Sequence, residues 1–295
     1  GLEWGLHDFN LTSAQRLSGF RSMIDQSYGG ADNAADWVTL AQFINYDGYR
    51  AIFEAQSRIR MGILLWMSHP CWPSFVWQTY DYYFDPTAGY FGSKKGSEPL
   101  HIQWNPVTDT VEVVNYSAGH APGLTARVEL LNMDGSVQWE KSAAVDSAED
   151  SVAAPITMEY PGGLTPVHFI RLKLTRADTA VSENFYWRGT EEGNFQALRT
   201  LPKVNLEAAT RAGRQGSRWV LKTELRNPSA HPALMVRLKT VRENSGDRIL
   251  PAIYSDNYVS LMPGERRFIV TQVQDADTRG EKPRMVVEGF NVGNR

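Results

Sequence analysis

Apolar positions follow a helical period in one early stretch of the chain. Across residues 32–60 they recur at intervals of three and four residues, the spacing that places side chains on one face of an α-helix. Asp32 or Asn33 can cap this helix, and Asp36 lies near its first turn, where the helix dipole favours an acid. The pattern therefore predicts one amphipathic helix. Its apolar stripe comprises Trp37, Leu40, Ala41, Ile44, Gly48, Ala51, Ile52, Ala55 and Ile59.

An unbroken apolar run, Gly62-Ile63-Leu64-Leu65-Trp66-Met67, follows the predicted helix. A strand that is apolar on both sides is typical of a parallel sheet with helices on both faces. The run therefore predicts a buried strand, and helix plus strand make one α/β unit. Because a single unit cannot close a parallel sheet, we expect the neighbours of this strand to come from elsewhere.

From about residue 100 the pattern changes to short runs in which apolar and polar residues alternate, with turn signals between them. The first series of predicted strands is 100–103, 110–115, 125–131, 137–141, 167–174 and 183–187. The second is 204–209, 218–225, 234–241, 258–261, 265–273 and 284–291. This doubled series predicts two immunoglobulin-like antiparallel β-sandwiches, joined near residues 193–202.

Composition narrows the class of protein. Of 295 residues, 42% are hydrophobic and 21% are charged, as in ordinary globular proteins. A formal net charge of −3 gives no reason to expect nucleic acid as a partner, and no apolar run reaches the roughly 20 residues that a membrane span requires. The single Cys71 excludes an internal disulfide framework and a multi-cysteine zinc site. Cytoplasmic, periplasmic and secreted locations all stay open.

The loop after the predicted buried strand is the best candidate for chemistry. Aromatic rings, which stack on sugar faces but equally fill cores, are concentrated in the first hundred residues. In (β/α)₈ barrels the functional residues stand at the C-terminal ends of the strands. Trp66 near the strand end, with His69 and Trp72 beyond it, fits that position. The alternative is a buried Trp66 and a turn stiffened by Pro70 and Pro73.

No catalytic constellation appears within the chain. The GxSxG, P-loop, GxGxxG and HExxH patterns are missing from the sequence. Retaining glycoside hydrolysis would need two carboxylates about 5–5.5 Å apart. Glu54 lies in mid-helix, and Asp81 and Asp85 are candidates for structural hydrogen-bond anchors among aromatic residues. We therefore nominate no catalytic pair and no metal ligand.

A family resemblance spans essentially the whole chain. Residues 62–74, continuing through 80–83 and 87–92, resemble one stretch of glycoside hydrolase family 2, most of all its exo-β-D-glucosaminidases, β-mannosidases and plant-type endo-β-mannosidases. Residues 98–103 and 111–115 resemble the entry into the first C-terminal sandwich of those enzymes, and residues 254–258 and 261–265 resemble the last sandwich.

The resemblance implies a mainly β chain made of the last helix–strand unit of a (β/α)₈ barrel followed by two sandwiches. We expect the barrel part over residues 1–97 and the sandwiches over 98–198 and 199–295. The resemblance also implies a retaining β-glycosidase that acts on an oligosaccharide or glycan with β-linked glucosaminide or mannoside units. Such chemistry needs no metal or organic cofactor.

By the same resemblance, both catalytic carboxylates lie upstream of Gly1, so this chain alone should be inactive. Trp66 matches the strand-8 tryptophan that forms the floor of the −1 subsite. His69 occupies a position where relatives of the glucosaminidase kind often have Asn, which leaves the sugar specificity open.

Two further expectations follow from the buried strand. The remaining barrel should come from a second polypeptide or an upstream fragment, or else the chain should cover the strand by self-association.

The rival interpretation is a non-catalytic carbohydrate-binding or adhesion module, or a purely structural fragment. It accounts for residues 100–295 equally well but not for the helix and strand before them.

Overall fold

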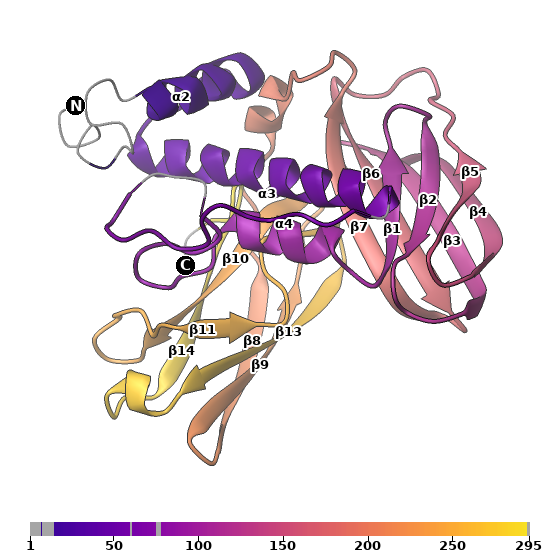
Figure 1. Cartoon of the computed structure of the whole chain (residues 1–295). Helices are drawn as coiled ribbons and strands as arrows, with labels where there is room; N and C mark the ends of the chain where they lie inside the picture. The colour runs from indigo at the N-terminus through magenta and orange to yellow at the C-terminus, as the bar shows by residue number, and fades with distance from the viewer. Residues whose placement is uncertain (1–6, 8–14, 60, 75–77, 294–295) are drawn as a thin grey trace.

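The computed structural model describes residues 7, 15–59, 61–74 and 78–293 (Figure 1). Three helices come first: α2 (Gln15–Tyr28), α3 (Ala34–Arg58) and α4 (Ala88–Gly96). The 14 strands that follow pair only in antiparallel ladders, apart from the isolated parallel bridge between Val204 and Val292. Within the described ranges, no helix has both the length and the apolar character needed to cross a membrane.

Strands β1 to β7 form two sheets that share one core. The three-stranded sheet has the order β1 (Leu100–Asn105), β2 (Thr110–Asn115), β5 (Ser151–Thr157). The four-stranded sheet has the order β4 (Val137–Ser147), β3 (Ala121–Asn132), β6 (Val167–Arg176), β7 (Thr179–Gly189). Alternate residues face inward, so that Ile102, Val113, Leu130 and Leu172 meet in a dry core.

Strands β8 to β14 form a second pair of sheets. One has the order β12 (Val259–Leu261), β10 (Ala233–Arg242), β14 (Pro283–Glu288). The other has the order β11 (Ala252–Tyr254), β13 (Arg266–Gln274), β9 (Arg218–Arg226), β8 (Glu207–Gln215). Two short 3₁₀ helices, η1 (Gln196–Thr200) and η2 (Ala276–Thr278), complete the elements.

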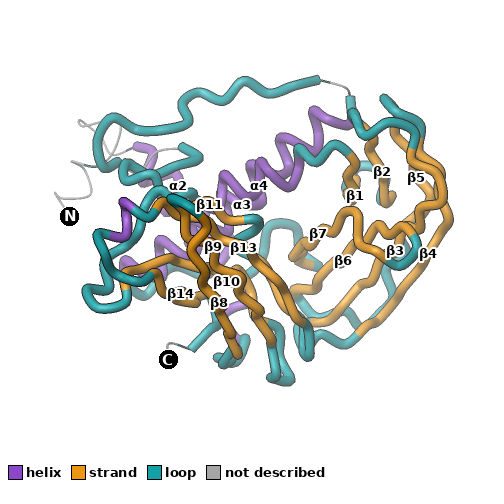
Figure 2. Tube along the Cα trace, turned by 90° about the horizontal axis from the view of Figure 1, so that it is seen from below, coloured by secondary structure: helices purple, strands orange, loops and turns teal. Residues whose placement is uncertain are grey.

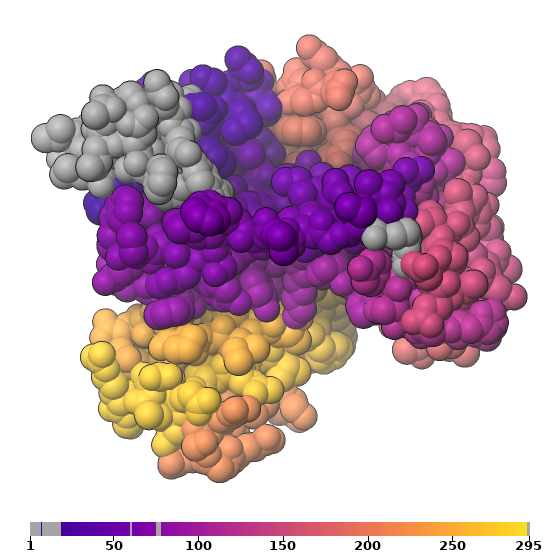
Figure 3. All heavy atoms as spheres, in the orientation of Figure 1, coloured from indigo at the N-terminus to yellow at the C-terminus, as the bar shows by residue number. Residues whose placement is uncertain are grey.

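Helix α3 packs against both sets of strands. Figure 2 shows α3 and α4 running between the two groups, and Figure 3 shows the C-terminal strands directly beneath the helical layer. The ring of Phe43 lies 4.9 Å from the ring of Trp187 in β7 and 5.1 Å from that of Phe290. One hydrophobic core therefore runs from the helices through Trp187 into the C-terminal strands.

The structure confirms the predicted helix and most predicted strands. Asn33 is the N-cap of α3, and its Oδ1 accepts a hydrogen bond from the Asp36 N–H at 3.0 Å. The strand over residues 110–115 has the predicted bounds. The pattern missed α2, α4, β5 and β11. In β5 only Ile156 is fully buried, so its apolar alternation is weak.

The predicted buried strand over 62–67 is wrong for this chain. Residues 61–67 have no regular secondary structure, the side chain of Leu64 is fully exposed, and Trp66 is 77% exposed. Among the described strands, none pairs with this segment. A central parallel strand needs a hydrogen-bonded neighbour on each side and a helix layer on each face. Without those neighbours, the apolar sequence alone does not make it a strand.

The apolar stripe of α3 divides into two parts. Leu40 and Ala41 in its N-terminal half are buried. In its C-terminal half Ile52 is 52% exposed and Ile59 is 55% exposed, while the buried positions are taken by Arg50 and Glu54. The outward half of the stripe and the 61–67 segment both expose apolar side chains, and we refer to them together as the open apolar strip.

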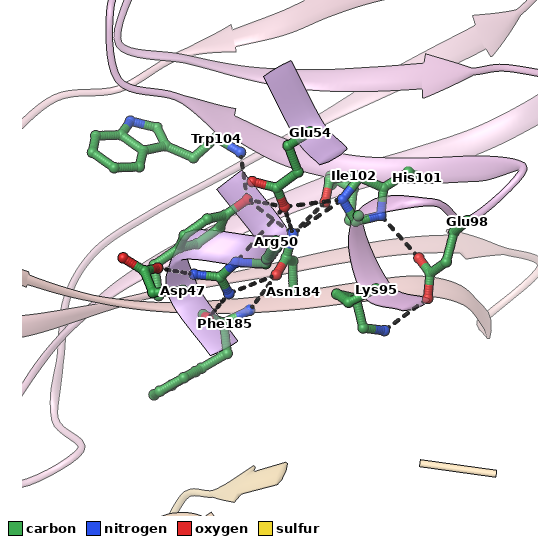
Figure 4. A network of polar contacts seen from close by, with 12 residues as sticks. Asp47, Arg50, Glu54, Lys95, Glu98, His101, Ile102, Trp104, Asn184 and Phe185 are labelled. Carbon is green, nitrogen blue, oxygen red and sulfur yellow. Dashed lines mark hydrogen bonds and ion pairs between the residues drawn. The ribbon is translucent and has the colours of Figure 1, made fainter. Parts of the chain in front are cut away.

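Arg50 is completely buried where α3 packs on β7 (Figure 4). Its guanidinium donates to Asp47 Oδ1 at 2.5 Å, to Asn184 Oδ1 at 3.1 Å and to the carbonyl of Phe185. The guanidinium carbon also lies 4.0 Å from the centroid of the Tyr186 ring. Because a buried charge is tolerated only when it is paired, these contacts fix the position of α3 on the strand.

Glu54 extends this network toward β1. Its Oε1 accepts from Asn184 Nδ2 at 2.7 Å and from the Tyr186 hydroxyl at 2.9 Å. The same oxygen lies 3.1 Å from His101 Nε2, and His101 Nδ1 lies 2.9 Å from Glu98 Oε2. Burial alone would lower the pKa of His101, but its hydrogen bonds to Glu54 and Glu98 outweigh burial and raise the pKa.

We expect Arg50→Ala to lower the free energy of unfolding by about 3–5 kcal/mol, because it removes a completely buried guanidinium from Asp47, Asn184 and Phe185. Asp47 would keep only its longer contact with Arg188, at 3.4 Å. Urea unfolding measures the loss. Arg21→Ala is the matched control, since Arg21 pairs with Asp25 only at the surface, at 3.8 Å, and should change stability by at most about 1 kcal/mol. Equal effects of the two variants would contradict a special role for the buried pair.

We also expect the stability that His101 contributes to depend on pH. Since its folded pKa is raised, this contribution is complete below its unfolded pKa of about 6.5 and is lost as pH rises through the folded value. The stability that Glu98 contributes depends on pH in the opposite direction. Burial alone would raise its pKa, but the hydrogen bond from His101 and the charge of Lys95 lower it to about 2, so its contribution is lost as pH falls toward that value.

The difference in unfolding free energy between wild type and His101→Gln should therefore be largest between about pH 4.3 and 6.5 and shrink at higher pH. Chemical denaturation at a series of pH values measures it. A difference that stays constant up to pH 9 would show that His101 is neutral in the folded chain.

Candidate functional site

The loop that carries the predicted site residues doubles back on itself. The Ser68 carbonyl accepts from the Tyr80 N–H at 3.1 Å and from the Thr79 hydroxyl at 3.2 Å. Tyr80 and Pro86 form an isolated antiparallel bridge. His7 Nδ1 lies 2.5 Å from a backbone carbonyl of the same loop. These contacts hold residues 68–74 and 78–87 as one closed structure, which we call the aromatic loop.

Two aspartates shape the tip of the aromatic loop. Asp81 Oδ1 accepts from the backbone N–H of Tyr83 at 2.8 Å and from that of Asp85 at 2.9 Å. Asp85 is buried, and its Oδ2 accepts from Arg237 at 2.5 Å and from Arg248 at 2.8 Å. The structure thus confirms both aspartates as structural anchors.

The arginines that hold Asp85 come from the C-terminal strands. Burial alone would lower the pKa of Arg237, but Tyr258, Asp85 and Glu288 outweigh burial and raise it. Arg237 also donates to Glu288 at 3.1 Å, and its guanidinium carbon lies 5.6 Å from the centroid of the Tyr258 ring. Its charge is therefore permanent, and the orientation of the loop depends on β10.

His69 is part of a stack of rings at the surface of the aromatic loop. Its ring lies 4.3 Å from that of Phe84 at an interplanar angle of 9°, and its Nε2 lies 3.2 Å from the Tyr82 carbonyl. Tyr82, Tyr83 and Phe84 are all exposed. Exposed, parallel ring faces of this kind can stack on the C–H faces of a sugar.

The three predicted site residues differ in their surroundings. Trp66 is exposed on the irregular 61–67 segment, Trp72 is half-buried, and His69 contacts Tyr82 and Phe84. Sequence reasoning did not nominate Tyr82 or Phe84 for the site. The run of aromatic residues over 80–84 was the available signal, but it did not indicate which rings would be fixed beside His69.

Two hollows adjoin the aromatic loop. The larger, of about 420 Å³, lies between the loop, the N-terminal half of α3 and the C-terminal strands. The smaller, of about 330 Å³, lies between His69, Phe84 and strand β11. In the described part of the chain, no group of three or more His, Cys, Asp or Glu side chains could hold a metal ion. The lining of the larger hollow includes aromatic rings and side-chain amides, which can stack on a ligand and form hydrogen bonds with it.

Three comparisons relate the chain to known proteins. A family described as the exo-β-D-glucosaminidase immunoglobulin-fold domain matches residues 184–292. An exo-β-D-glucosaminidase of Streptomyces avermitilis is 33% identical over 91% of this chain and 33% of its own length. A mannosylglycoprotein endo-β-mannosidase of Lilium longiflorum is 27% identical over 90% of this chain and 34% of its own length. The chain thus spans about a third of the curated relatives it matches.

A solved structure agrees with these relatives. The crystal structure of the Amycolatopsis orientalis exo-chitosanase superposes with a TM-score of 0.89 and 29% identity, over 95% of this chain and 36% of that one. Residues 184–292 therefore match an immunoglobulin-fold domain of exo-β-D-glucosaminidases, and about nine-tenths of the chain is similar to exo-β-D-glucosaminidases and to an endo-β-mannosidase.

Proposed function

We propose that this chain supplies one wall of the sugar site in a retaining β-glycosidase that hydrolyses β-linked glucosaminide or mannoside units. The relatives carry the names of enzymes with these activities, and their similarity covers about nine-tenths of the chain. The observation that carries the proposal is Trp66, which is 77% exposed and precedes the aromatic loop by two residues. An exposed indole at the end of an apolar segment is suited to lie beneath a sugar ring.

Catalysis in the proposed enzyme needs two carboxylates from outside this chain. One would protonate the leaving oxygen, and the other would attack the anomeric carbon. Within this chain, the acids nearest to the site have structural roles: Asp81 binds backbone N–H groups, and Asp85 binds two arginines. The role left to the chain is to bind and orient the sugar, with Trp66, His69 and Trp72 as the proposed contacts.

We further propose three domains, with the barrel part over residues 1–97 and sandwiches over 98–198 and 199–295. The two separate pairs of sheets support this division. The segment proposed to join the sandwiches is held in place, because the Phe195 N–H donates to the Ser27 carbonyl at 2.7 Å and Arg199 pairs with Asp32 at 2.7 Å. The joint is therefore fixed to the helices.

The open apolar strip supports a barrel completed by other chain segments. Ile52, Ile59 and Leu64 expose apolar area that a soluble monomer normally buries. Strands placed beside residues 61–67 would pair its backbone groups and cover this face of α3. We propose that those strands come from the remainder of the enzyme, as an upstream fragment or a second polypeptide.

In the complete enzyme, Trp66→Ala should lower kcat/KM by about 1–3 kcal/mol of transition-state stabilisation, the scale of one lost stacking contact. Steady-state kinetics on β-glucosaminides and β-mannosides measure the loss. Phe268→Ala is the control, because Phe268 is an equally exposed aromatic residue on β13. If both variants keep the wild-type kcat/KM, Trp66 is not part of the sugar site, and a binding-module function gains support.

The isolated chain should associate through the open apolar strip, either with itself or with the remainder of the enzyme. Light scattering should then give a mass above the 33.2 kDa of one chain, and Ile52→Lys combined with Leu64→Lys should reduce it. Amides of residues 61–67 should exchange quickly in the monomer and slowly in the complex. A wild-type monomer in which this segment is protected without a partner would contradict the proposal.

A further inference from the structure

The larger hollow beside the aromatic loop has the composition of a ligand site. Its volume of about 420 Å³ is within the range of about 300–1,000 Å³ that is common for small-molecule sites. Rings line it from three directions: Trp37 from α3, Tyr82 and Tyr83 from the aromatic loop, and Tyr258 beside the C-terminal strands. This hollow is separate from the one beside His69, which shares only Tyr80 and Pro86 with it.

Amide and hydroxyl groups without partners point to a polar ligand. Gln78 lines the hollow and is only 5% exposed, yet its Nε2 has no hydrogen-bond partner. The Oγ of Ser74, in the same lining, is also buried without a partner. Gln42 accepts from the Ala88 N–H through Oε1 at 2.8 Å, so its Nε2 remains a donor. An unsatisfied buried donor costs about 1–3 kcal/mol, which a bound acceptor would recover.

The charges around the hollow pair with one another. Asp85 accepts from both Arg237 and Arg248, and Asp81 lies 3.5 Å from Arg248. Two carboxylates and two guanidinium groups cancel, so a charged ligand would have to break a buried pair, at a large cost. The hollow has aromatic rings that can stack on a ligand, amides that can bind hydroxyl groups, and no net charge. These three properties fit an uncharged sugar.

We propose that this hollow binds an uncharged hexose unit of a β-linked glycan, at a position distinct from the Trp66 contact. The choice of ligand rests on the proposed function. Gln78 and Gln42 would donate hydrogen bonds to sugar hydroxyl or acetamido oxygens, and the tyrosine rings would pack on the sugar faces. The site needs the C-terminal strands, because Arg237 and Arg248 hold the loop that forms its wall.

Saturation-transfer difference NMR on the 295-residue chain tests the site, with β-1,4-mannobiose and N,N′-diacetylchitobiose as neutral probes. Gln78→Leu should weaken binding by about 3- to 10-fold, the effect of one lost hydrogen bond. It should leave the melting temperature unchanged or raise it, because it removes an unsatisfied buried donor. Phe268→Ala, which changes an exposed residue of β13 that does not line the hollow, should bind like wild type.

Three results would overturn the proposal. The first is that neither probe shows saturation transfer at millimolar concentration. The second is that Gln78→Leu binds the probes with wild-type affinity. The third is that the glucosamine disaccharide, whose amines are charged at pH 6, binds as tightly as the neutral probes or more tightly. If Gln78→Leu does not fold, Gln42→Leu gives the same test from α3. Should the neutral probes bind as expected while the complete enzyme cleaves no β-glycoside, this site stands and the proposed function fails.

Discussion

The buried charge of Arg50 is the constraint on which the arrangement of helices and strands depends. An arginine with no exposed surface is tolerated only where its donors meet acceptors, and here those acceptors come from Asp47 on the same helix and from Asn184 and Phe185 on β7. Sliding α3 along β7 by one turn would separate them. The network therefore sets the register of the helix on the sandwich, and a purely apolar contact would not do so as strictly.

That register has a consequence for the other face of the helix. With Arg50 and Glu54 turned toward the strands, Ile52 and Ile59 must point away from them, because a helix places such residues on opposite sides. The helix thus has a polar, extensively hydrogen-bonded face toward the sandwich and an apolar face on its opposite side.

The helices and strands that depend on local interactions could be predicted from local patterns in the sequence. Helix α3 with its Asn33 cap and the strand over 110–115 could both be inferred from sequence. The segment 62–67 could not, because a parallel strand depends on neighbours rather than on its own residues. The hollow and the Arg50 network join residues more than a hundred positions apart, and single-sequence patterns carry no signal for such pairs.

The C-terminal strands contribute to the site, although they lie far from the aromatic loop along the sequence. Asp85 is satisfied only by Arg237 and Arg248, and Asp85 with Asp81 fixes the backbone of residues 81–85. The exposed rings of that loop thus take their orientation from residues about 150 positions further along the chain. The Asp85 side chain is 6% exposed and pairs with two guanidinium groups, of which that of Arg237 is the more buried. These paired charges indicate that the C-terminal part of the chain positions the aromatic loop.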